Sequence, residues 1–302
     1  MTEPILPPTV ALVLHFRNAT VTAACLRSLH EEAVKRLVLV DNSEDEGKSL
    51  LQLSEDLQSL RMAGMEIVVL EPGHNLGFSA GVNRGLALIY QRFGPASVLL
   101  INSDAQLAPR AHQLLRLALN EFDGKAVCAP FLRASNGTLV ASVFYHRVFG
   151  LYLRRPMLGA FQYVSGCCLL LPPALTASPL FDEEFFFYGD DVELGWRLAD
   201  TGIVLRLVDG AYADHDGSGS SHNGSLFYEY HMARAHLALT RKLGAGAFGR
   251  IVMLLGRFML LPARALVRSI RFRSLSPWRG LGMACVDFAR GRRRSLTPPS
   301  TD

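Results

Sequence analysis

The stretch VALVLHFRN, Val10–Asn18, decides the fold, because its pattern of an apolar run (Val10–Leu14) followed by polar residues returns three more times. The later apolar runs are Leu37–Val40, Ile67–Leu70 and Val98–Ile101. Helix-like stretches lie next to them, at Val21–Glu32, Lys48–Met62 and Ser79–Arg92. Apolar strands that alternate with helices are typical of a parallel sheet buried on both faces. The sequence therefore predicts an α/β fold with a mostly parallel central sheet flanked by helices.

Polar residues follow each of the four apolar runs. The four polar segments are His15–Asn18, Asp41–Ser43, Gly73–Asn75 and Asn102–Asp104. Each segment by itself is an ordinary turn signal. In open parallel sheets, however, ligands bind beyond the carboxyl ends of the strands. The four segments together therefore predict a crevice that binds a polar ligand.

The segment Asn75–Gly85 leads from the third run into a helix, with Ser79 as the expected N-cap. Its glycines, Gly77, Gly81 and Gly85, are spaced four apart and do not form the G-x-G-x-x-G dinucleotide fingerprint. No glycine turn follows the first strand either. These features argue against an NAD enzyme and against a methyltransferase with a Gly-rich first loop. The glycines either permit tight helix packing or let loop amides face a phosphate.

Two adjacent acids, Asp190 and Asp191, follow the aromatic segment Phe185–Tyr188 at the start of a predicted helix. Neighbouring carboxylates repel, so at least one is expected to have a raised pKa, which suits proton abstraction. Aspartate is also a favoured N-cap residue, and acids in a first turn interact well with the helix dipole. From these residues alone, catalysis and capping are equally good interpretations.

Two further apolar runs predict strands, at Val164–Pro172 and Ile203–Val208. The second leads to His215, which lies among small residues and carboxylates where a metal or a phosphate can be reached. Cys167 and Cys168 are adjacent in the first run, and none of the five cysteines has metal-type spacing. This pattern predicts buried thiols in a reducing compartment, without a zinc site or a disulfide framework.

Charge divides the chain into an acidic body and a basic tail. The chain has 302 residues, is 49% hydrophobic and has a net charge of +4, but Arg250–Arg294 holds eleven arginines and one acid, Asp287. A basic tail on an acidic body argues against a nucleic-acid-binding domain. Arginines and Pro262 interrupt the apolar residues of the tail, which argues against a transmembrane helix. We expect a basic amphipathic tail on an anionic membrane surface; the alternative is a helix that packs on the body with a solvated arginine face.

The order of these motifs resembles the inverting family 2 glycosyltransferases of the GT-A fold, most closely their bacterial rhamnosyltransferase-like branch. The resemblance runs from about Val10 to about Arg241. It rests on six markers in order: Asp41-Asn42, Asn75–Phe78 with Gly81–Asn83, Asn102–Asp104, Val164–Gly166, Phe186–Asp191, and His215 followed by Ser220-Ser221. It implies a GT-A glycosyltransferase domain over residues 1–245 and a basic, apolar helical tail over 246–302.

The resemblance also implies roles for matching residues. Asp191 corresponds to the catalytic base and Asp190 to the first acid of its pair, while Asp104 and His215 correspond to metal-side ligands. Asp41 corresponds to the acid that reads the nucleotide base, and Phe16 to an aromatic neighbour of that base. Further residues expected to bind the nucleotide sugar are Asn42, Asn75, Gly77, Phe78, Asn83, Asn102 and Ser103. The chain departs from the pattern at Asn102, where the first acid of the D-x-D metal motif is expected, and at Arg17, where an asparagine is usual.

The implied reaction is a single displacement with inversion, assisted by Mg²⁺ or Mn²⁺, from a nucleotide-diphosphate sugar to a glycan or lipid-linked glycan. The resemblance favours dTDP-rhamnose as the donor, with galactofuranose or another hexose as alternatives. It implies bacterial surface polysaccharide synthesis by a cytoplasmic enzyme that is peripheral on the inner face of the plasma membrane. Met1–Pro8 agrees with this location, because it lacks the basic flank and apolar core of a signal peptide.

Two other functions compete with this interpretation. A sugar nucleotidyltransferase shares a similar sheet, but it usually carries a Gly-rich, basic loop straight after the first strand, and His15–Asn18 is not such a loop. The other is a catalytically silent membrane scaffold or a subunit that only binds a sugar nucleotide. Intact acids at Asp41, Asp104 and Asp191 argue against it, although Asn102 leaves room for it.

Overall fold

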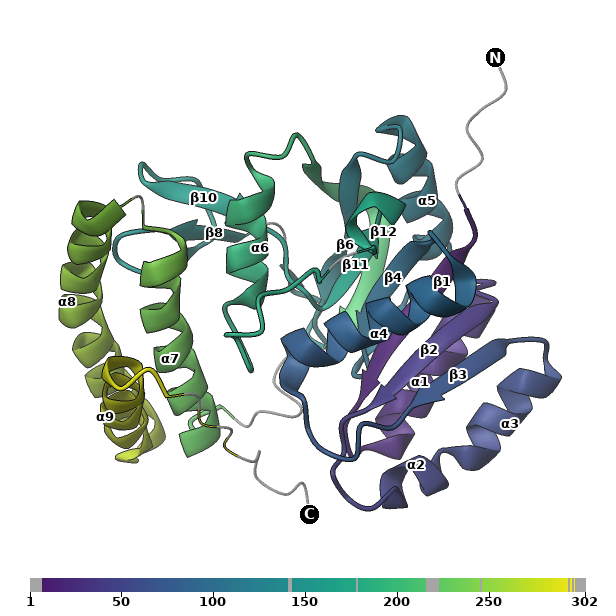
Figure 1. Ribbon diagram of the computed structural model, residues 1–302, viewed down its shortest axis with the longest axis horizontal. Helices are drawn as coiled ribbons and strands as arrows, with labels where there is room; N and C mark the ends of the chain where they lie inside the picture. The colour runs from purple at the N-terminus through teal and green to yellow at the C-terminus, as the bar shows by residue number, and fades with distance from the viewer. Residues whose placement is uncertain are drawn as a thin grey trace. The chain divides into compact units, whose positions relative to one another are not determined.

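The computed structural model describes residues 7–140, 143–177, 179–215, 223–244, 246–292, 294 and 296 (Figure 1). The chain forms two compact units, which we call the sheet unit and the helical unit. The sheet unit comprises Met1–Ser142, Val164–Phe181 and Arg197–Gly217, and the helical unit comprises Val143–Tyr163, Asp182–Trp196 and Ser218–Asp302. The tail therefore groups with residues 218–245 and with the segment of the two acids, and a domain boundary at residue 245 stays a prediction. Of the stretches named above, Met1–Pro8, Ser220-Ser221 and the tail over residues 246–302 lie wholly or partly outside the described residues.

All four apolar runs of the N-terminal half are strands. They are β1 (Thr9–His15), β2 (Arg36–Asp41), β3 (Glu66–Leu70) and β4 (Ser97–Asn102). They run parallel in the spatial order β3-β2-β1-β4 (Figure 1). In this register His15 lies opposite Asp41, and Leu14 lies opposite Asn102. The polar segments that follow these strands consequently share one edge of the sheet, as the sequence predicts.

The helices beside these strands are α1 (Ala19–Glu31), α2 (Lys48–Gln52), α3 (Ser54–Met62) and α4 (Gly77–Phe93). The single helix predicted over Lys48–Met62 is thus interrupted at Leu53. Ser79 is not the N-cap of α4, because the helix begins at Gly77 and the Ser79 hydroxyl is buried without a hydrogen-bond partner among the described residues. The helix starts early because Gly77, at φ +76°, makes the turn from the strand.

The two later glycines of α4 serve helix packing. A Cβ atom on Gly85 would meet Cδ1 of Leu12 in β1 at 2.3 Å, and one on Gly81 would meet Cδ2 of Leu14 at 2.8 Å. Such approaches are far shorter than normal carbon contacts, so only glycine lets α4 lie this close to the sheet. Of the two interpretations of these glycines, packing is the one that the structure supports.

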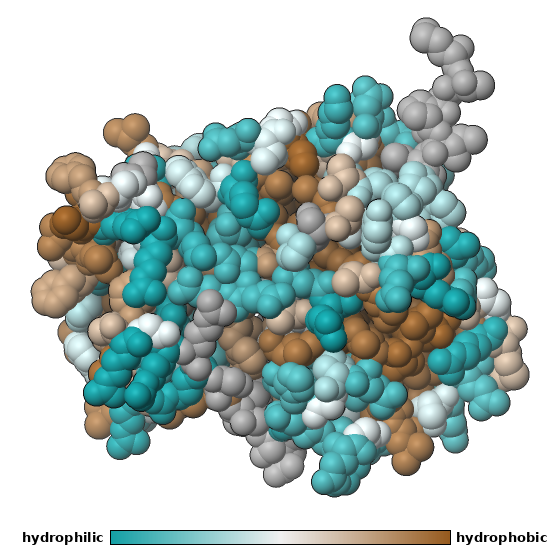
Figure 2. All heavy atoms as spheres, in the orientation of Figure 1, coloured by the Kyte–Doolittle hydropathy of each residue, from teal (hydrophilic) through white to brown (hydrophobic). Residues whose placement is uncertain are grey.

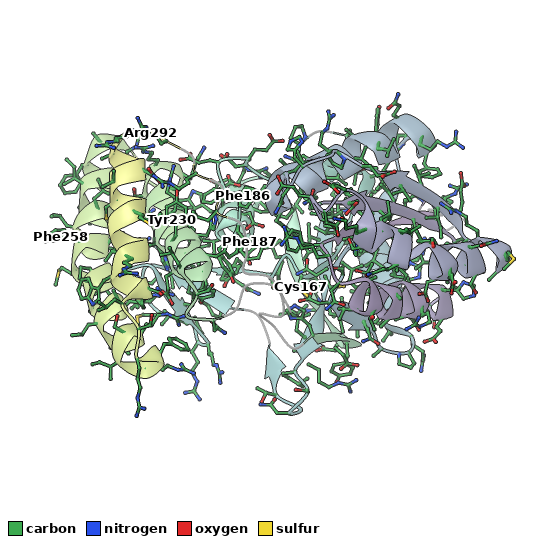
Figure 3. All side chains as sticks on the ribbon, turned by 90° about the horizontal axis from the view of Figure 1, so that it is seen from below. Cys167, Phe186, Phe187, Tyr230, Phe258 and Arg292 are labelled. Carbon is green, nitrogen blue, oxygen red and sulfur yellow. The ribbon has the colours of Figure 1, made fainter. Side chains whose placement is uncertain are left out.

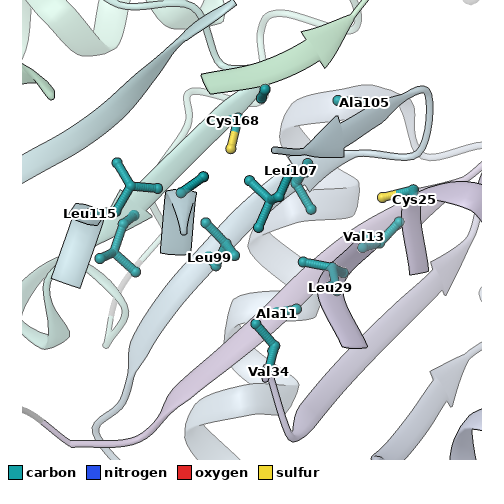
Figure 4. Close-up of a cluster of buried hydrophobic side chains, with 14 of the residues drawn as sticks. Ala11, Val13, Cys25, Leu29, Val34, Leu99, Ala105, Leu107, Leu115 and Cys168 are labelled. Carbon is teal, nitrogen blue, oxygen red and sulfur yellow. The ribbon is translucent and has the colours of Figure 1, made fainter. Parts of the chain in front are cut away.

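The second half of the sheet contains antiparallel strands. Its elements are β5 (Ala105–Leu107), α5 (Ala111–Glu121), β6 (Ala126–Arg133), β7 (Leu139–Val140), β11 (Cys168–Leu171), a 3₁₀ turn (Pro173–Leu175) and β12 (Val204–His215). The spatial order continues as β4-β11-β6-β12-β5, with β11 antiparallel to β4 and β6, and β5 antiparallel to β12. A buried cluster that includes Val13, Leu99, Leu115 and Cys168 packs on this sheet (Figure 4). Cys167 and Cys168 are buried free thiols, as predicted.

The helical unit holds a small sheet and a helical bundle. The strands β8 (Val143–His146), β9 (Leu151–Leu153) and β10 (Ala160–Tyr163) form an antiparallel sheet in the order β10-β8-β9. The helices are α6 (Asp190–Leu198), whose last two residues belong to the sheet unit, α7 (Leu226–Lys242), α8 (Gly246–Phe272) and α9 (Ser276–Ala289). Both α8 and α9 pack on α7. No helix in the described part of the chain is long and apolar enough to span a membrane.

Three of the five arginines of α8 point inward, and the helix exposes an apolar stripe. Arg257 is fully buried, while Arg264 and Arg268 form ion pairs of 2.9 Å and 2.6 Å with the buried Glu229 of α7. The exposed large apolar residues of α8 are Phe248, Ile251, Leu254, Leu255, Phe258, Met259, Leu266, Val267 and Ile270. Figure 2 shows brown spheres gathered over α8, and Figure 3 shows Phe258 on the side of α8 away from α7. The tail therefore packs on the body, but without the solvated arginine face that the alternative interpretation expected.

Candidate active site

The ends of β1 and β2 place Asp41 beside a buried histidine in the sheet unit. Asp41 is 8% exposed, and its Oδ1 accepts a hydrogen bond from the Ser43 amide at 2.9 Å. His15 is completely buried, with Nδ1 at 2.8 Å from Thr22 Oγ1 and Nε2 at 3.0 Å from Ser49 Oγ. Burial lowers the pKa of His15 although the charge of Asp41 opposes this effect. His15 is thus a neutral ring that fixes the loops around Asp41.

Amide side chains hold the loop that leads into α4. Asn42 donates from Nδ2 to the carbonyl oxygen of Gly77 at 3.0 Å, and Asn75 accepts from the Gly77 amide at 2.9 Å. Gly77 has φ +76°, a left-handed backbone that glycine adopts without strain. Three predicted ligand-binding residues are therefore joined in one hydrogen-bonded loop at the carboxyl edge of the sheet.

Aromatic residues flank this edge. The Arg17 guanidinium lies 4.9 Å from the centre of the Phe16 ring, and Arg17 donates from Nε to the Ser43 carbonyl oxygen at 3.0 Å. Arg17, where the sequence departs from the family pattern, also has the uncommon φ of +58°. Phe78 packs on Phe181 with a ring-centre distance of 5.4 Å. These contacts place Phe16 next to the segment that carries Asp41 and Ser43.

Asn83 has a clear structural role. Its Nδ2 donates to the Phe181 carbonyl oxygen at 2.8 Å, and its Oδ1 accepts from the amides of Leu180 and Phe181 at 2.9 and 3.1 Å. The side chain therefore ties α4 to residues 180–181, which accounts for a buried asparagine without a ligand. A direct contact of Asn83 with a nucleotide sugar stays a prediction.

The predicted metal-side residues meet in the sheet unit. Nε2 of His215 lies 3.3 Å from Oδ1 of Asp104, with their side chains 16% and 29% exposed. Strand β5, which the sequence analysis did not predict, produces this contact, because it pairs with β12 and sets His215 opposite Ala105. Asn102 is the last residue of β4, and its backbone N–H donates to the Cys167 carbonyl oxygen at 2.8 Å. Ser103 and Asp104 form the turn into β5.

The two adjacent acids lie in the first turn of α6, in the helical unit. The first helical hydrogen bond runs from the Glu193 amide to the Gly189 carbonyl oxygen at 2.9 Å, so Gly189 occupies the cap position. Neither acid is therefore the N-cap residue, although both lie where the helix dipole favours negative charge. Tyr188 before them has φ +64°, a strained conformation for a bulky residue that is found most often at functional sites.

The two acids differ in their surroundings. Asp190 is 6% exposed, and burial together with the charge of Asp191 raises its pKa well above the usual range. Asp191 is half-buried, and its Oδ1 accepts from the Val192 amide at 2.8 Å. Burial raises the pKa of Tyr145 to about 12 and that of Tyr163 further, and the charge of Asp191 adds to both effects. Burial thus favours the protonated form of Asp190 more than that of its less buried neighbour, a difference typical of acid–base pairs.

An ion pair next to His215 escaped the sequence analysis. Arg133 of β6 donates to both carboxylate oxygens of Asp214, from Nε at 2.6 Å and from an Nη at 2.9 Å. The two residues are opposite one another in the β6–β12 register. No sequence motif identifies Arg133 as a site residue. Its pairing with Asp214 depends on a register shift between Leu207 and Tyr212, which cannot be predicted from the sequence.

Comparison with known proteins supports the resemblance. No protein-family model matches the chain. Two curated proteins, from the CDC 1551 / Oshkosh and ATCC 25618 / H37Rv strains of Mycobacterium tuberculosis, are each an N-acetylglucosaminyl-diphospho-decaprenol L-rhamnosyltransferase. Each is 26% identical over 218 residues, which is 62% of this chain and 68% of the relative.

Solved structures show the fold. A mannosyltransferase from Pyrobaculum calidifontis in complex with GDP-Man and Mn²⁺ superimposes with a TM-score of 0.54 at 12% identity, over 96% of this chain and 89% of the other. TarS of S. aureus superimposes with a TM-score of 0.50 at 13% identity, over 95% and 93% of the two chains. The fold is thus that of GT-A glycosyltransferases, and the sequence similarity is to rhamnosyltransferases, which is consistent with a glycosyltransferase of the family 2, rhamnosyltransferase-like type.

Proposed function

We propose that the protein transfers rhamnose, with inversion, from dTDP-rhamnose to a hydroxyl of a diphospho-lipid-linked sugar during bacterial surface polysaccharide synthesis. The observation that carries the proposal is the Asp104–His215 pair at 3.3 Å, on the same sheet in which the two strands flanking β1 end in Asp41 and Asn102. The curated relatives act on a diphospho-decaprenol acceptor, which supports this class of acceptor and this sugar.

In this proposal the sheet unit binds the donor. Asp41 accepts hydrogen bonds from the nucleotide base, and Phe16 packs on that base. The loop formed by Asn42, Asn75 and Gly77 lies along the diphosphate and sugar. A parallel sheet suits this role, because the carboxyl ends of its strands form a rigid rim for a polar ligand.

Asp104 and His215 have the chemistry expected of metal ligands. One carboxylate and one imidazole suit Mn²⁺ better than Mg²⁺, which prefers oxygen ligands. The described residues contain no group of three or more histidine, cysteine, aspartate or glutamate side chains able to hold an ion. These two residues would therefore hold a divalent cation together with oxygens of the donor diphosphate. The cation would supply positive charge against the charge that develops on the leaving diphosphate.

Loss of the Asp104 carboxylate should weaken donor binding in the presence of Mn²⁺. We expect Asp104→Asn to reduce the affinity for dTDP with Mn²⁺ at least about tenfold, because a neutral amide is a poor cation ligand. The measurement is the rise in melting temperature that dTDP produces with and without Mn²⁺. Asp214→Asn is the matched control, since that carboxylate lies next to His215 but pairs with Arg133. Equal rises for wild type and Asp104→Asn would contradict the assignment.

The helical unit supplies the base. Asp191 removes the proton from the acceptor hydroxyl as that oxygen bonds to the anomeric carbon. The bond from that carbon to the donor diphosphate breaks, and the electron pair leaves with the diphosphate. Attack on the face opposite the leaving group inverts the configuration. The neutral carboxyl of Asp190 suits this scheme, because a second negative charge beside Asp191 would bind the departing proton in its place.

The exposed apolar stripe of α8 is the proposed membrane contact. Phe248 and Phe258 are each 80% exposed, and Ile270 is 71% exposed. Arg271, Arg273 and Arg279 are exposed at the C-terminal end of the stripe, where they can attract an anionic lipid surface. A lipid-anchored acceptor is located at the membrane surface, so an enzyme that binds this surface is close to its substrate. The occupant of this face is therefore an anionic membrane.

Polar substitution of the stripe should release the protein from vesicles. We expect Phe248→Ser, Phe258→Ser and Ile270→Ser together to lower binding to phosphatidylglycerol-containing vesicles at least about a thousandfold, since each buried apolar side chain contributes about 1.5–3 kcal/mol. Co-sedimentation measures the effect, and raised salt should weaken binding of the wild type. Leu51→Ser with Met62→Ser is the control, because these side chains of the sheet unit are 73% and 77% exposed. Unchanged binding of the triple variant would refute the proposed face.

Product analysis tests the reaction itself. The wild-type protein is incubated with dTDP-rhamnose, Mn²⁺ and a synthetic diphospho-lipid-linked N-acetylglucosamine. The proposal expects dTDP release that depends on the acceptor. A nucleotidyltransferase would instead form or consume pyrophosphate, and a silent scaffold would release nothing. A panel of other nucleotide sugars in the same assay reports the donor preference.

A further inference from the structure

A hollow in the helical unit lies next to the segment that carries the two acids. Its enclosed volume is about 20 Å³, and the rest of it opens to solvent. Its wall consists of Glu184–Tyr188, of Tyr230, His231, Arg234, Ala235 and Ala238 on α7, and of Arg294. Figure 3 shows Phe186 and Phe187 beside α7, which carries Tyr230. Tyr188, which lines the hollow, precedes the proposed base Asp191 by three residues in the chain.

Two buried nitrogens at the hollow have no hydrogen-bond partner among the described residues. They are Nε2 of His231 and Nη1 of Arg234. His231 is 3% exposed and Arg234 is 8% exposed, so bulk water does not readily supply their partners. A buried unsatisfied polar group costs about 1–3 kcal/mol, more when charged, and native proteins seldom leave two together. Both atoms indicate a ligand that brings hydrogen-bond acceptors.

The charges around the hollow favour a ligand with a negative charge. The second Nη of Arg234 donates to Glu184 at 3.3 Å, and Glu184 also lies 3.4 Å from Nζ of Lys242 and 3.9 Å from an Nη of Arg241. Lys242 also pairs with Asp182, and Arg294 pairs with Asp287 at 3.0 Å. Three cationic side chains thus balance the negative charge of Glu184. The unpaired Nη1 of Arg234 is therefore available to a ligand.

The aromatic walls hold His231 in place. Its ring stacks on Phe186 at a centre distance of 5.2 Å and packs against Phe227 at 4.6 Å. Burial and the neighbouring Arg234 lower the pKa of His231 to about 3, so the ring is neutral and can carry a hydrogen on Nε2. A fixed N–H donor beside a guanidinium group is an arrangement that suits phosphate oxygens.

We propose that this hollow, the His231–Arg234 pocket, binds a phosphate-type oxyanion, and that its occupant during the reaction is the diphosphate of the lipid-linked acceptor. The second part rests on the proposed function. The pocket would fix the diphosphate while the sugar attached to it presents its hydroxyl group to Asp191. Arg234 and His231 are then residues of the acceptor site, apart from the donor-binding edge of the sheet unit.

Binding of inorganic pyrophosphate tests the pocket directly. Calorimetric titration of the full-length protein in EDTA avoids any site that needs a divalent cation. We expect His231→Phe to weaken binding at least tenfold, which corresponds to about 1.4 kcal/mol for one lost charge-assisted hydrogen bond. Arg234→Lys, which keeps the charge beside Glu184, should weaken binding as well. Arg241→Gln is the matched control and should bind like the wild type, because Arg241 contacts Glu184 but does not line the hollow.

Stability separates a binding role from a purely structural one. Phenylalanine keeps the aromatic packing of His231 and removes its unpaired nitrogen, so His231→Phe should melt at or above the wild-type temperature. A loss of both pyrophosphate binding and melting temperature in this variant would overturn the proposal, provided that Arg234→Lys binds normally. Equal pyrophosphate binding by wild type and His231→Phe would overturn it as well.

Two acceptors with the same sugar identify the occupant. For His231→Phe we expect KM to rise at least tenfold for a diphospho-lipid glycoside and to stay unchanged for a neutral alkyl glycoside. If pyrophosphate binding depends on His231 but KM rises equally for both acceptors, the oxyanion site stands and the acceptor assignment is wrong. If the wild type binds pyrophosphate through His231 but transfers no sugar, the pocket stands and the proposed function fails.

Discussion

Asp191→Asn is expected to lower the rate of sugar transfer on the order of 10³-fold while nucleotide binding stays within about twofold of the wild type. General base catalysis contributes roughly 10²–10⁴-fold, and asparagine cannot accept the proton of the acceptor hydroxyl. The side chain keeps its size, and its carbonyl oxygen can still accept from the Val192 amide. Initial rates of acceptor-dependent dTDP release measure the first effect, and titration with dTDP measures the second.

Asp190→Asn is the matched control, because it changes the neighbouring acid by the same single group. Asp190 is buried with a raised pKa, so an amide resembles the neutral form that it adopts, and we expect less than about a tenfold loss of rate. If Asp190→Asn instead loses as much activity as Asp191→Asn, or more, the roles of the two acids are reversed.

The same variant has a predicted pH signature. Because the folded-state pKa of Asp190 lies above its unfolded value, the wild type loses stability from this group as the pH rises from the unfolded pKa toward the folded one. Asp190→Asn lacks that proton. Its melting temperature relative to the wild type should therefore be smallest near pH 4 and rise toward neutral pH. A difference that does not change with pH would contradict the raised pKa.

The sequence predicts the donor-binding half of the site well, because two simple signals coincide there. Apolar runs such as Val10–Leu14 and Val98–Ile101 are unambiguous when both faces of a sheet are buried. Their polar ends must then share an edge, so Asp41 and Asn102 follow from topology alone. The contact between Asp104 and His215 did not follow in this way. It depends on β5, a strand of three residues that is too short to give a periodic pattern.

The tail shows where a correct pattern leads to an incomplete conclusion. Arginines at regular spacing in Gly246–Phe272 predict an amphipathic helix, and α8 is one. Sequence alone assigns the charged face to solvent, because isolated buried charges are costly. The structure instead turns three of these arginines inward. Glu229 of α7 forms ion pairs with Arg264 and Arg268, and backbone carbonyl oxygens accept hydrogen bonds from Arg257. Such partners lie far away in the sequence, and no local pattern identifies them.

Arg257→Leu is consequently expected to destabilise the helical unit by at least about 3 kcal/mol, because each buried acceptor that is left unpaired costs about 1–3 kcal/mol. The guanidinium donates to the carbonyl oxygens of Val148 at 2.6 Å, of Arg147 at 3.0 Å and of His236 at 3.2 Å, and to the Tyr145 hydroxyl at 3.0 Å. Leucine would fill part of the space and leave buried acceptors unpaired. Thermal and urea unfolding measure the loss.

The surroundings of Arg257 leave little room for adjustment. A Cβ atom on Gly150 would meet the guanidinium carbon at 2.6 Å, and one on Gly256 would meet the Val148 carbonyl oxygen at 2.4 Å. Helix α8 therefore packs directly on the turn that follows β8. Water cannot easily enter there to replace the N–H donors of Arg257. Arg271→Leu, an exposed position on the same helix, is the control and should change stability by less than about 0.5 kcal/mol.

This prediction also decides how the tail must be tested. Removal of residues 250–302 takes away Arg257, both partners of Glu229 and all of α9, so the remaining helical unit should unfold rather than become a membrane-free enzyme. Loss of membrane binding after such a truncation would then reflect unfolding and not the loss of a lipid contact. If Arg257→Leu and Arg271→Leu melt at the same temperature, the tail is a dispensable appendage, and truncation becomes a valid test of membrane binding.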